Sequence, residues 1–352
     1  MPHFATDDDF RKALLARLRQ LTATTGWEHH ESARAFALQQ LTSRLFRSDS
    51  KDDWVLTGGT ALQYRSTEAR PTADVDLAFA ADAATLRDVL VAALAPHSGE
   101  YGTFDITVSA SADRGQHEVR VAYLIGTKPL VRTSLDINTV RTLNLAADTL
   151  TPAPLVAMPD LPPPPPMRVY PVAQHLADKV TAMYELHGPE KATPSTRPHD
   201  LADIVVLARS SPVDAGELRT AVRAEEQRRG VSVPTPLTLP DQSWTNTYGP
   251  RVAQSNLPLA LHDARTALRA ANAFLGPALS GDIPAGRWDP TTLTWTIPGL
   301  PAAERAPMSD FLRAMRPEQN RSATPHRDRG STRHPVEPST YDTRTDTGYT
   351  LE

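Results

Sequence analysis

The chain has 352 residues, of which 22% are charged, and its formal net charge at pH 7 is −4. This balance gives no global basic field, so a nucleic acid could bind only at a local basic patch. The absence of cysteine excludes disulfides and thiolate metal sites and is typical of a cytoplasmic protein. The first residues, MPHFATDDDF, lack the apolar core of a secretory signal, and no run of apolar residues is long enough to predict a membrane span.

Apolar spacing predicts a helical segment over residues 1–50 and a mixed sheet with flanking helices over 51–150. In chain order we expect helices over 7–21 and 31–46, a strand over 52–56, a helix beginning near residue 60, a strand over 74–79, a helix over 84–94, and strands over 118–125 and 131–137.

Proline marks the middle of the chain, because Pro162 to Pro166 form an unbroken run. Such a run is stiff and extended, so residues 151–171 are predicted to be a connector. Beyond it we expect a mainly helical second lobe over 172–316, with helices over 172–186, 199–208 and 259–275 and a small hairpin over 287–299. Apolar residues are sparse in 317–352, which predicts a disordered tail. The expected fold class is α+β.

Two carboxylates, Asp74 and Asp76, are the strongest candidates for chemistry. On a strand they lie on one face with Cα atoms about 6.5 Å apart, so they repel unless a cation lies between them. Oxygen ligands at this spacing suit Mg²⁺, which binds through one or two carboxylates plus substrate phosphates. In an arbitrary protein, an exposed acidic strand face would be the simpler interpretation. Here Val75 and Leu77 make the opposite face of the strand apolar, and a glycine pair precedes the strand, so we favour the functional interpretation.

The segment Gly58-Gly59-Thr60 follows the first predicted strand and opens a helix. Glycines at this position let backbone amides approach a phosphate, and Thr60 adds a hydroxyl. Gly-Gly turns are common, so the signal gains its meaning from the acids that follow about fifteen residues later.

Asp136 is the candidate third carboxylate. It projects from the polar face of its strand, between Leu135 and Ile137, and would complete a three-acid metal site if that strand lies beside 74–79. It could then activate an attacking hydroxyl, as a base or through a metal. An ordinary surface position on the strand is an equal alternative.

Several charged residues could offset the charge of a triphosphate. Arg70 could contact phosphate or only fix the turn before the acids, and Lys179 could be a phosphate-binding cation or a solvated lysine. Asp200 and Asp203 share a helix face and could orient Lys179 or Arg197, or simply favour the helix N-terminus.

In order along the chain, ALQQLTSRLF, VLTGGTAL, RPTADVDLAF, LADKVTAMYEL and RPHDLADIVVLA closely resemble the motifs of the AbiEii/AbiGii toxin family of nucleotidyltransferases, which includes the mycobacterial MenT toxins. The resemblance covers about residues 30 to 210. It implies a polymerase-β-like nucleotidyltransferase core with a helical second lobe. It also implies a toxin of a toxin–antitoxin or phage-defence system, with a cognate antitoxin as a partner. Characterised members transfer nucleotides from an NTP, pyrimidines in the MenT group, to the 3′ end of tRNA and block aminoacylation.

By this resemblance, Gly59 and Thr60 match the phosphate-binding turn, Asp74 and Asp76 match the metal-binding pair, and Lys179 matches a lysine that contacts the nucleotide. Arg197, Asp200 and Asp203 match the later R-x-K-D-x-x-D motif. Thr57 and His199 stand where many members carry lysine, which leaves the choice of nucleotide open.

The expected reaction is the Mg²⁺-dependent transfer (Mn²⁺ as a substitute) of NMP from an NTP to an RNA 3′ end, with release of pyrophosphate. Asp74, Asp76 and Asp136 would hold metal, and Lys179 and Asp200 would complete the catalytic set. Gly58, Gly59, Thr60, Arg70, Lys179 and Arg197 would bind the nucleotide. Arg44, Arg47, Arg65 and the basic N-terminal helix could supply a basic surface for RNA. A protein or small-molecule acceptor, or binding of nucleotide or antitoxin without turnover, are the alternatives.

Overall fold

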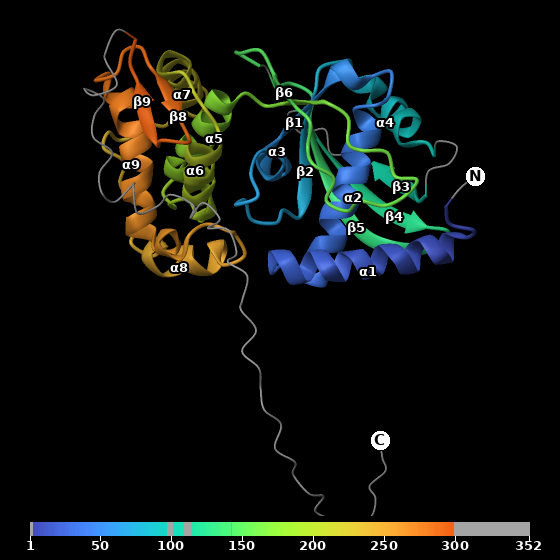
Figure 1. Ribbon diagram of the computed structural model, residues 1–352. Coiled ribbons are helices and arrows are strands. Elements are labelled where there is room, and N and C mark those ends of the chain that lie inside the picture. The colour runs from blue at the N-terminus through green and yellow to red at the C-terminus, as the bar shows by residue number, and fades with distance from the viewer. Residues whose placement is uncertain (1–2, 97–100, 109–114, 142, 299–352) are drawn as a thin grey trace, which may run out of the picture. The chain divides into compact units, whose positions relative to one another are not determined.

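The computed structural model describes residues 3–96, 101–108, 115–141 and 143–298, which belong to one compact unit, Met1–Arg316. The predicted tail over 317–352 lies outside the described residues. Figure 1 shows a sheet with helices against it, followed by a largely helical second half. The α+β fold class is therefore confirmed.

A seven-stranded mixed sheet forms the first half, with strand order β3-β4-β5-β2-β1-β7-β6. Its strands are β1 (Trp54–Thr57), β2 (Asp74–Phe79), β3 (Thr103–Val108), β4 (Gln116–Ile125), β5 (Lys128–Asn138), β6 (Asp148–Leu150) and β7 (Met167–Val169). The pairs β2–β5 and β1–β7 are parallel, and the other pairs are antiparallel. Strand β2, which carries the acids, thus lies inside the sheet, between β5 and β1.

The helices of the first half are α1 (Asp7–Thr25), α2 (His29–Leu45), α3 (Gly58–Arg65) and α4 (Leu86–Leu94). Apolar residues of α2 and α4, such as Leu41 and Leu90, are buried in one cluster with Val75 and Leu77 of β2. Burial of such side chains contributes about 1.5–3 kcal/mol each relative to exposure. Because alternate residues of a strand face opposite sides, this packing leaves Asp74 and Asp76 on the other face.

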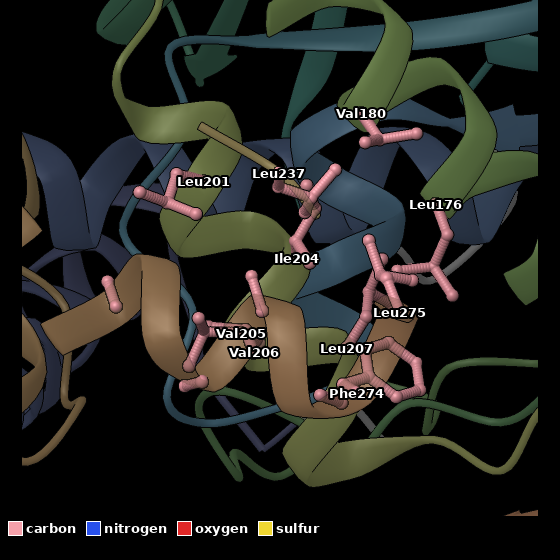
Figure 2. Packing of buried hydrophobic residues seen from close by; sticks show 14 of the residues in the cluster. Leu176, Val180, Leu201, Ile204, Val205, Val206, Leu207, Leu237, Phe274 and Leu275 are labelled. Carbon is pink, nitrogen blue, oxygen red and sulfur yellow. The ribbon is translucent and has the colours of Figure 1, made fainter. Parts of the chain in front are cut away.

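The second half contains α5 (Val172–Tyr184), α6 (His199–Ser210), α7 (Ala215–Arg229), α8 (Trp244–Val252), η4 (Leu259–His262) and α9 (Ala264–Ser280). Its core is the cluster in Figure 2, where Leu176 of α5, Leu207 of α6 and Phe274 of α9 pack together. The predicted hairpin is confirmed as β8 (Arg287–Asp289) and β9 (Thr294–Thr296).

Several strand assignments differ from the sequence prediction, which did not include β3, β6 or β7. The first strand begins at Trp54 instead of residue 52, because residues 51–53 form a 3-10 turn. Strand β7 lies inside the segment predicted as a connector, and its Met167 and Val169 are fully buried against the sheet. The chain therefore returns to the sheet after the proline run, although the domain boundaries drawn from the sequence stay a prediction.

The predicted helix over 259–275 is two elements. Asp263 accepts a hydrogen bond from the backbone N–H of Thr266 and caps α9, so the α-helix begins only at Ala264 and η4 precedes it. No helix among the described residues is long and apolar enough to cross a membrane.

Candidate active site

Most of the residues singled out from the sequence line one pocket of about 510 Å³. They come from the N-terminus of α3, from the segments before β2 and before α6, and from β2, β5, α5 and α6. Those that line the pocket are Gly58, Gly59, Arg70, Asp74, Asp76, Asp136, Lys179, Arg197 and Asp200.

The three predicted acids lie on adjacent strands. Asp76 stands opposite Asp136 in the parallel β2–β5 pair, and Asp74 lies two residues earlier on the same face. Burial raises the pKa of Asp76, and the nearby charge of Asp74 raises it further. Burial likewise raises the pKa of Asp136, with added effects of Asp76 and Asp74. These three carboxylates therefore repel one another in a partly desolvated place.

Such carboxylates fit a divalent cation, since a positive charge between them relieves the repulsion. No group of three or more His, Asp or Glu side chains within the described residues is arranged as a metal site. Two carboxylates suffice for Mg²⁺ when substrate phosphates complete the oxygen ligands. Asp74 and Asp76 could hold the ion in this way.

The glycine pair contacts the carboxylate of one of these acids, Asp76. Gly58 has a positive φ of 58°, and a Cβ atom there would lie 1.7 Å from Oδ2 of Asp76. The backbone N–H of Gly59 donates to the Asp76 carboxylate. Gly58 is the first residue of α3, so the predicted turn is itself the start of the helix. The turn and the acid thus form one unit.

Thr60 and Thr72 hold the other acid. The hydroxyl of Thr60 is buried and donates to the backbone carbonyl of Asp74 at 2.9 Å. Thr72 donates to Oδ1 of Asp74 at 3.1 Å. Thr60 does not line the pocket, so its hydroxyl supports the strand in this structure, and its predicted contact with phosphate stays a prediction.

Lys179 lies at the centre of a buried charge cluster that links α5 to α6. Its Nζ is 2.9 Å from Oδ1 of Asp200 and 2.6 Å from Oδ2 of Asp203, and its side chain is only 8% exposed. Burial alone would lower the pKa of Lys179, but the two acids outweigh it and raise the pKa. Of the two interpretations of Lys179, the solvated lysine is therefore wrong.

Two arginines extend the same cluster. Nε of Arg197 donates to Oδ2 of Asp200 at 2.9 Å, and Nε of Arg70 lies 3.7 Å from Oδ1 of Asp203. Burial would raise the pKa of both acids, but Lys179 and these arginines hold it well below the ordinary value. Asp200 and Asp203 thus stay charged and orient the cations, as one of the sequence interpretations expected.

Sequence reasoning missed a second ion-pair chain on the pocket wall. Arg141, just after β5, pairs with Asp178 of α5, and its guanidinium lies 4.4 Å from the centre of the Tyr170 ring. Arg229 of α7 contacts Glu185 at 2.5 Å and Asp178 at 3.6 Å. The acid beside Lys179 in LADKV was the available signal for Asp178, whereas Arg229 lies in a helix that apolar spacing did not reveal.

His175, one turn before Lys179, was also missed. Its ring is buried, and neither ring nitrogen has a hydrogen-bond partner among the described residues. Burial, with the nearby charge of Lys179, lowers its pKa to about 3, so the ring is neutral at pH 7.

The arginines expected to form a basic surface for RNA are engaged elsewhere. Arg44 is buried and donates to the carbonyls of Leu94 and Gly102. Arg65 is 11% exposed and pairs with Asp148. Arg47 donates to carbonyls in the proline run. The expectation of an open basic patch from Arg44 and Arg65 is therefore wrong, because the fold uses both internally.

Comparisons with known proteins identify the family and the fold. Residues 40–283 match the family described as nucleotidyl transferase AbiEii toxin, type IV TA system. No curated protein is significantly similar to the chain in sequence. Among solved structures, MenT4, a nucleotidyltransferase toxin from Mycobacterium tuberculosis, is 18% identical with a TM-score of 0.50, over 75% of this chain and 88% of that one. JHP933 from Helicobacter pylori is 15% identical with a TM-score of 0.44, over 72% of this chain and 93% of that one.

The likeness to MenT4 concerns the fold, whereas the family match spans more than half of the sequence. The chain belongs to the AbiEii family of nucleotidyltransferase toxins of type IV toxin–antitoxin systems.

Proposed function

We propose that the chain transfers NMP from an NTP to the 3′ hydroxyl of an RNA, with tRNA as the acceptor, in a reaction that depends on Mg²⁺ or Mn²⁺. The observation that carries this proposal is the pocket where Asp74, Asp76 and Asp136 lie with Lys179 and Arg197. Modification of tRNA in the cytoplasm would block translation, and a cognate antitoxin would restrain it. A role in phage defence follows from the same activity.

The three acids would have different roles in the reaction. Mg²⁺, when held by Asp74 and Asp76 with the triphosphate oxygens, supplies charge neutralisation at the phosphates. Asp136 would accept the proton of the attacking hydroxyl. Its raised pKa supports this role, because a carboxylate with a pKa nearer neutrality is a stronger base.

The cations would position the triphosphate. Arg197 has a half-exposed side chain, and only its Nε is bonded to Asp200 within the described part of the chain. Its two terminal nitrogens are therefore available for phosphate oxygens in the planar geometry that suits them. Arg70, Gly58, Gly59 and Lys179 would surround the same group, while Asp200 would hold Lys179 and Arg197 in place.

The first test removes the charge of each acid of β2. We expect Asp74→Asn and Asp76→Asn to lower nucleotide transfer at least about a hundredfold, since each removes charge that positions the transferred group. Each labelled NTP is incubated with whole tRNA, and the RNA 3′ ends are then sequenced. Asp105→Asn, which neutralises an exposed acid of β3, is the matched control and should keep full activity.

Undiminished labelling by both acid variants would contradict the proposal. Label on a protein or a small molecule, with none on RNA, would leave NMP transfer intact but refute the RNA acceptor.

A further inference from the structure

A second pocket of about 350 Å³ is bordered by the same chain segment, 193–199, as the active-site pocket. One wall is the segment that leads into α6, and the other is α8 with the residues before it. Its lining residues are Thr193, Pro194, Ser195, Thr196, Pro198, Asp241, Ser243, Trp244, Thr247 and Arg251.

The two pockets share the segment that leads into α6. Thr196 lines the second pocket and Arg197 lines the active-site pocket, and the Cα atoms of consecutive residues are only about 3.8 Å apart. Pro198 likewise lines the second pocket and His199 the active-site pocket, so the two pockets border different sides of one segment, and a chain-like ligand that bends around this segment could contact both.

The pocket is held open by the fold. Trp244 is buried, and its Nε1 donates to the carbonyl of Ser195 at 2.9 Å, which ties α8 to the opposite wall. Asp241 accepts a hydrogen bond from the backbone N–H of Ser243 at 2.8 Å and fixes the start of α8. Such ties reduce the ordering cost that a ligand would otherwise meet on binding.

The side chains that line this pocket suit a sugar-phosphate ligand. Five of the lining residues carry hydroxyl groups, and one guanidinium and one carboxylate accompany them. Hydroxyls and a carboxylate bind sugar hydroxyl groups, and a guanidinium binds phosphate. The only aromatic ring in the lining, Trp244, is 1% exposed, so no ring face is available for a base to stack on.

Two of these groups lack partners in the structure. Arg251 is exposed, and no hydrogen bond or ion pair joins its side chain to a described residue. Oγ of Ser195 is buried and has no hydrogen-bond partner within the described ranges. The Ser195 hydroxyl is inaccessible in this structure, so Arg251 is the group of the two that a ligand in the pocket can contact.

We propose that this pocket binds a ribose-phosphate unit of the acceptor RNA, upstream of the 3′ hydroxyl that is placed at the acids. Arg251 contacts the phosphate, and Asp241 with the neighbouring hydroxyls contacts the ribose. The inference rests on the proposed function in that it takes RNA as the acceptor. It supplies an RNA contact that the internally used Arg44 and Arg65 do not.

The first experiment measures the affinity of tRNA for the full chain by fluorescence anisotropy over a series of salt concentrations. Arg251→Gln should weaken binding about tenfold, as expected for the loss of one charge-assisted contact. It should also reduce the slope of log affinity against log salt by about 0.7, the value for one phosphate of a single strand. Arg223→Gln removes an exposed arginine of α7 that lines neither pocket, and it should change neither quantity.

Ser195→Ala serves as a buried control in the wall of the pocket. We expect the variant to unfold at the same temperature as the natural chain or higher, because it removes an unpaired buried hydroxyl, and to bind tRNA as the natural chain does, because that hydroxyl is inaccessible. Asp241→Asn should reduce the preference for an RNA end over the same sequence with 2′-deoxyribose, since the 2′ hydroxyl distinguishes the two.

The affinity for NTP is measured in parallel and should be unchanged in all of these variants. RNA affinity and salt slope of Arg251→Gln equal to those of the natural chain would overturn the inference. So would weaker binding of a purified antitoxin by Arg251→Gln with unchanged RNA binding, because the pocket would then serve a protein partner. A natural chain that binds RNA through Arg251 but transfers no nucleotide would refute the proposed function and leave this site standing.

Discussion

At the scale of single residues, Gly58 has a role beyond conformational freedom. Its positive φ favours glycine, and the absence of a side chain also leaves room for the Asp76 carboxylate. A methyl group at this position would displace the acid, so the local backbone and the chemistry of the site are coupled.

We therefore predict that Gly58→Ala abolishes nucleotide transfer, whereas Gly230→Ala does not affect it. Both glycines have positive φ, but a Cβ atom at Gly230 meets nothing within 4 Å. The strain of alanine in this conformation, about 1 kcal/mol, should thus lower the free energy of unfolding in both variants. Chemical unfolding and transfer assays provide the two measurements, and equal activity of the two variants would contradict this role of Gly58.

The sequence predicts the acids of β2 well, because the alternation in DVDLAF fixes which side chains share a face. Whether Asp136 lies beside Asp76 depends on which strands pair in the sheet. The periodicity of a single segment does not show its pairing partner. The contact of Gly58 with Asp76 and the internal bonds of Arg44 could not be predicted for the same reason, since they join residues that are distant in the sequence.

At the scale of elements, α5 and α6 are joined by charges as well as by apolar contacts. Lys179 comes from α5, and its partners Asp200 and Asp203 come from α6, with all three side chains buried. Apolar residues of both helices, such as Leu176 and Ile204, also pack in the core shown in Figure 2. A buried ion pair contributes little net stability, but loss of one partner leaves an uncompensated charge.

Lys179→Met should accordingly lower the free energy of unfolding by about 3–5 kcal/mol, in addition to its effect on activity. Adding Asp203→Asn should recover part of this loss, because one of the two buried carboxylates that lose Lys179 becomes neutral. A double-mutant cycle by denaturant titration measures the coupling. Additive effects of the two substitutions would show that the pair does not interact in solution.

Apolar periodicity predicts α5 and α6 because each presents an apolar face to the core. It did not predict α7, in which charged residues such as Arg228 and Arg229 outnumber the buried ones. It also missed β7, where only Met167 and Val169 point to the core and five prolines precede them. Short elements carry too few residues for a period to be recognised.

At the scale of the whole molecule, stability should depend on pH through a histidine that the fold keeps neutral. The folded pKa of His175 is about 3, below the ordinary histidine value of about 6.5. The unfolded chain therefore binds a proton that the folded chain does not, and stability falls as pH drops below about 6.5. The lowered pKa values of Asp200 and Asp203 affect stability in a lower pH range. The stability that these two carboxylates contribute to the folded chain is lost only below about pH 4.

We expect His175→Leu to flatten the dependence of unfolding free energy on pH between 4 and 6 by about 1.4 kcal/mol per pH unit, the value for one proton. Denaturant titrations at several pH values provide the measurement. His29→Gln, at an exposed position of α2, should leave the slope unchanged. An unaltered slope in His175→Leu would mean that this histidine is protonated in the folded chain.

The return of the chain to the sheet at β7 has a consequence for backbone integrity. Strand β7 pairs in parallel with β1. Arg47, just after the C-terminal end of α2, donates hydrogen bonds to carbonyls of the proline run that precedes β7. A backbone break between residues 151 and 161 would thus yield two fragments, of which the second supplies a strand to the sheet of the first. The protein is therefore suited to division into complementing halves at this segment, where reassembly would rebuild the sheet.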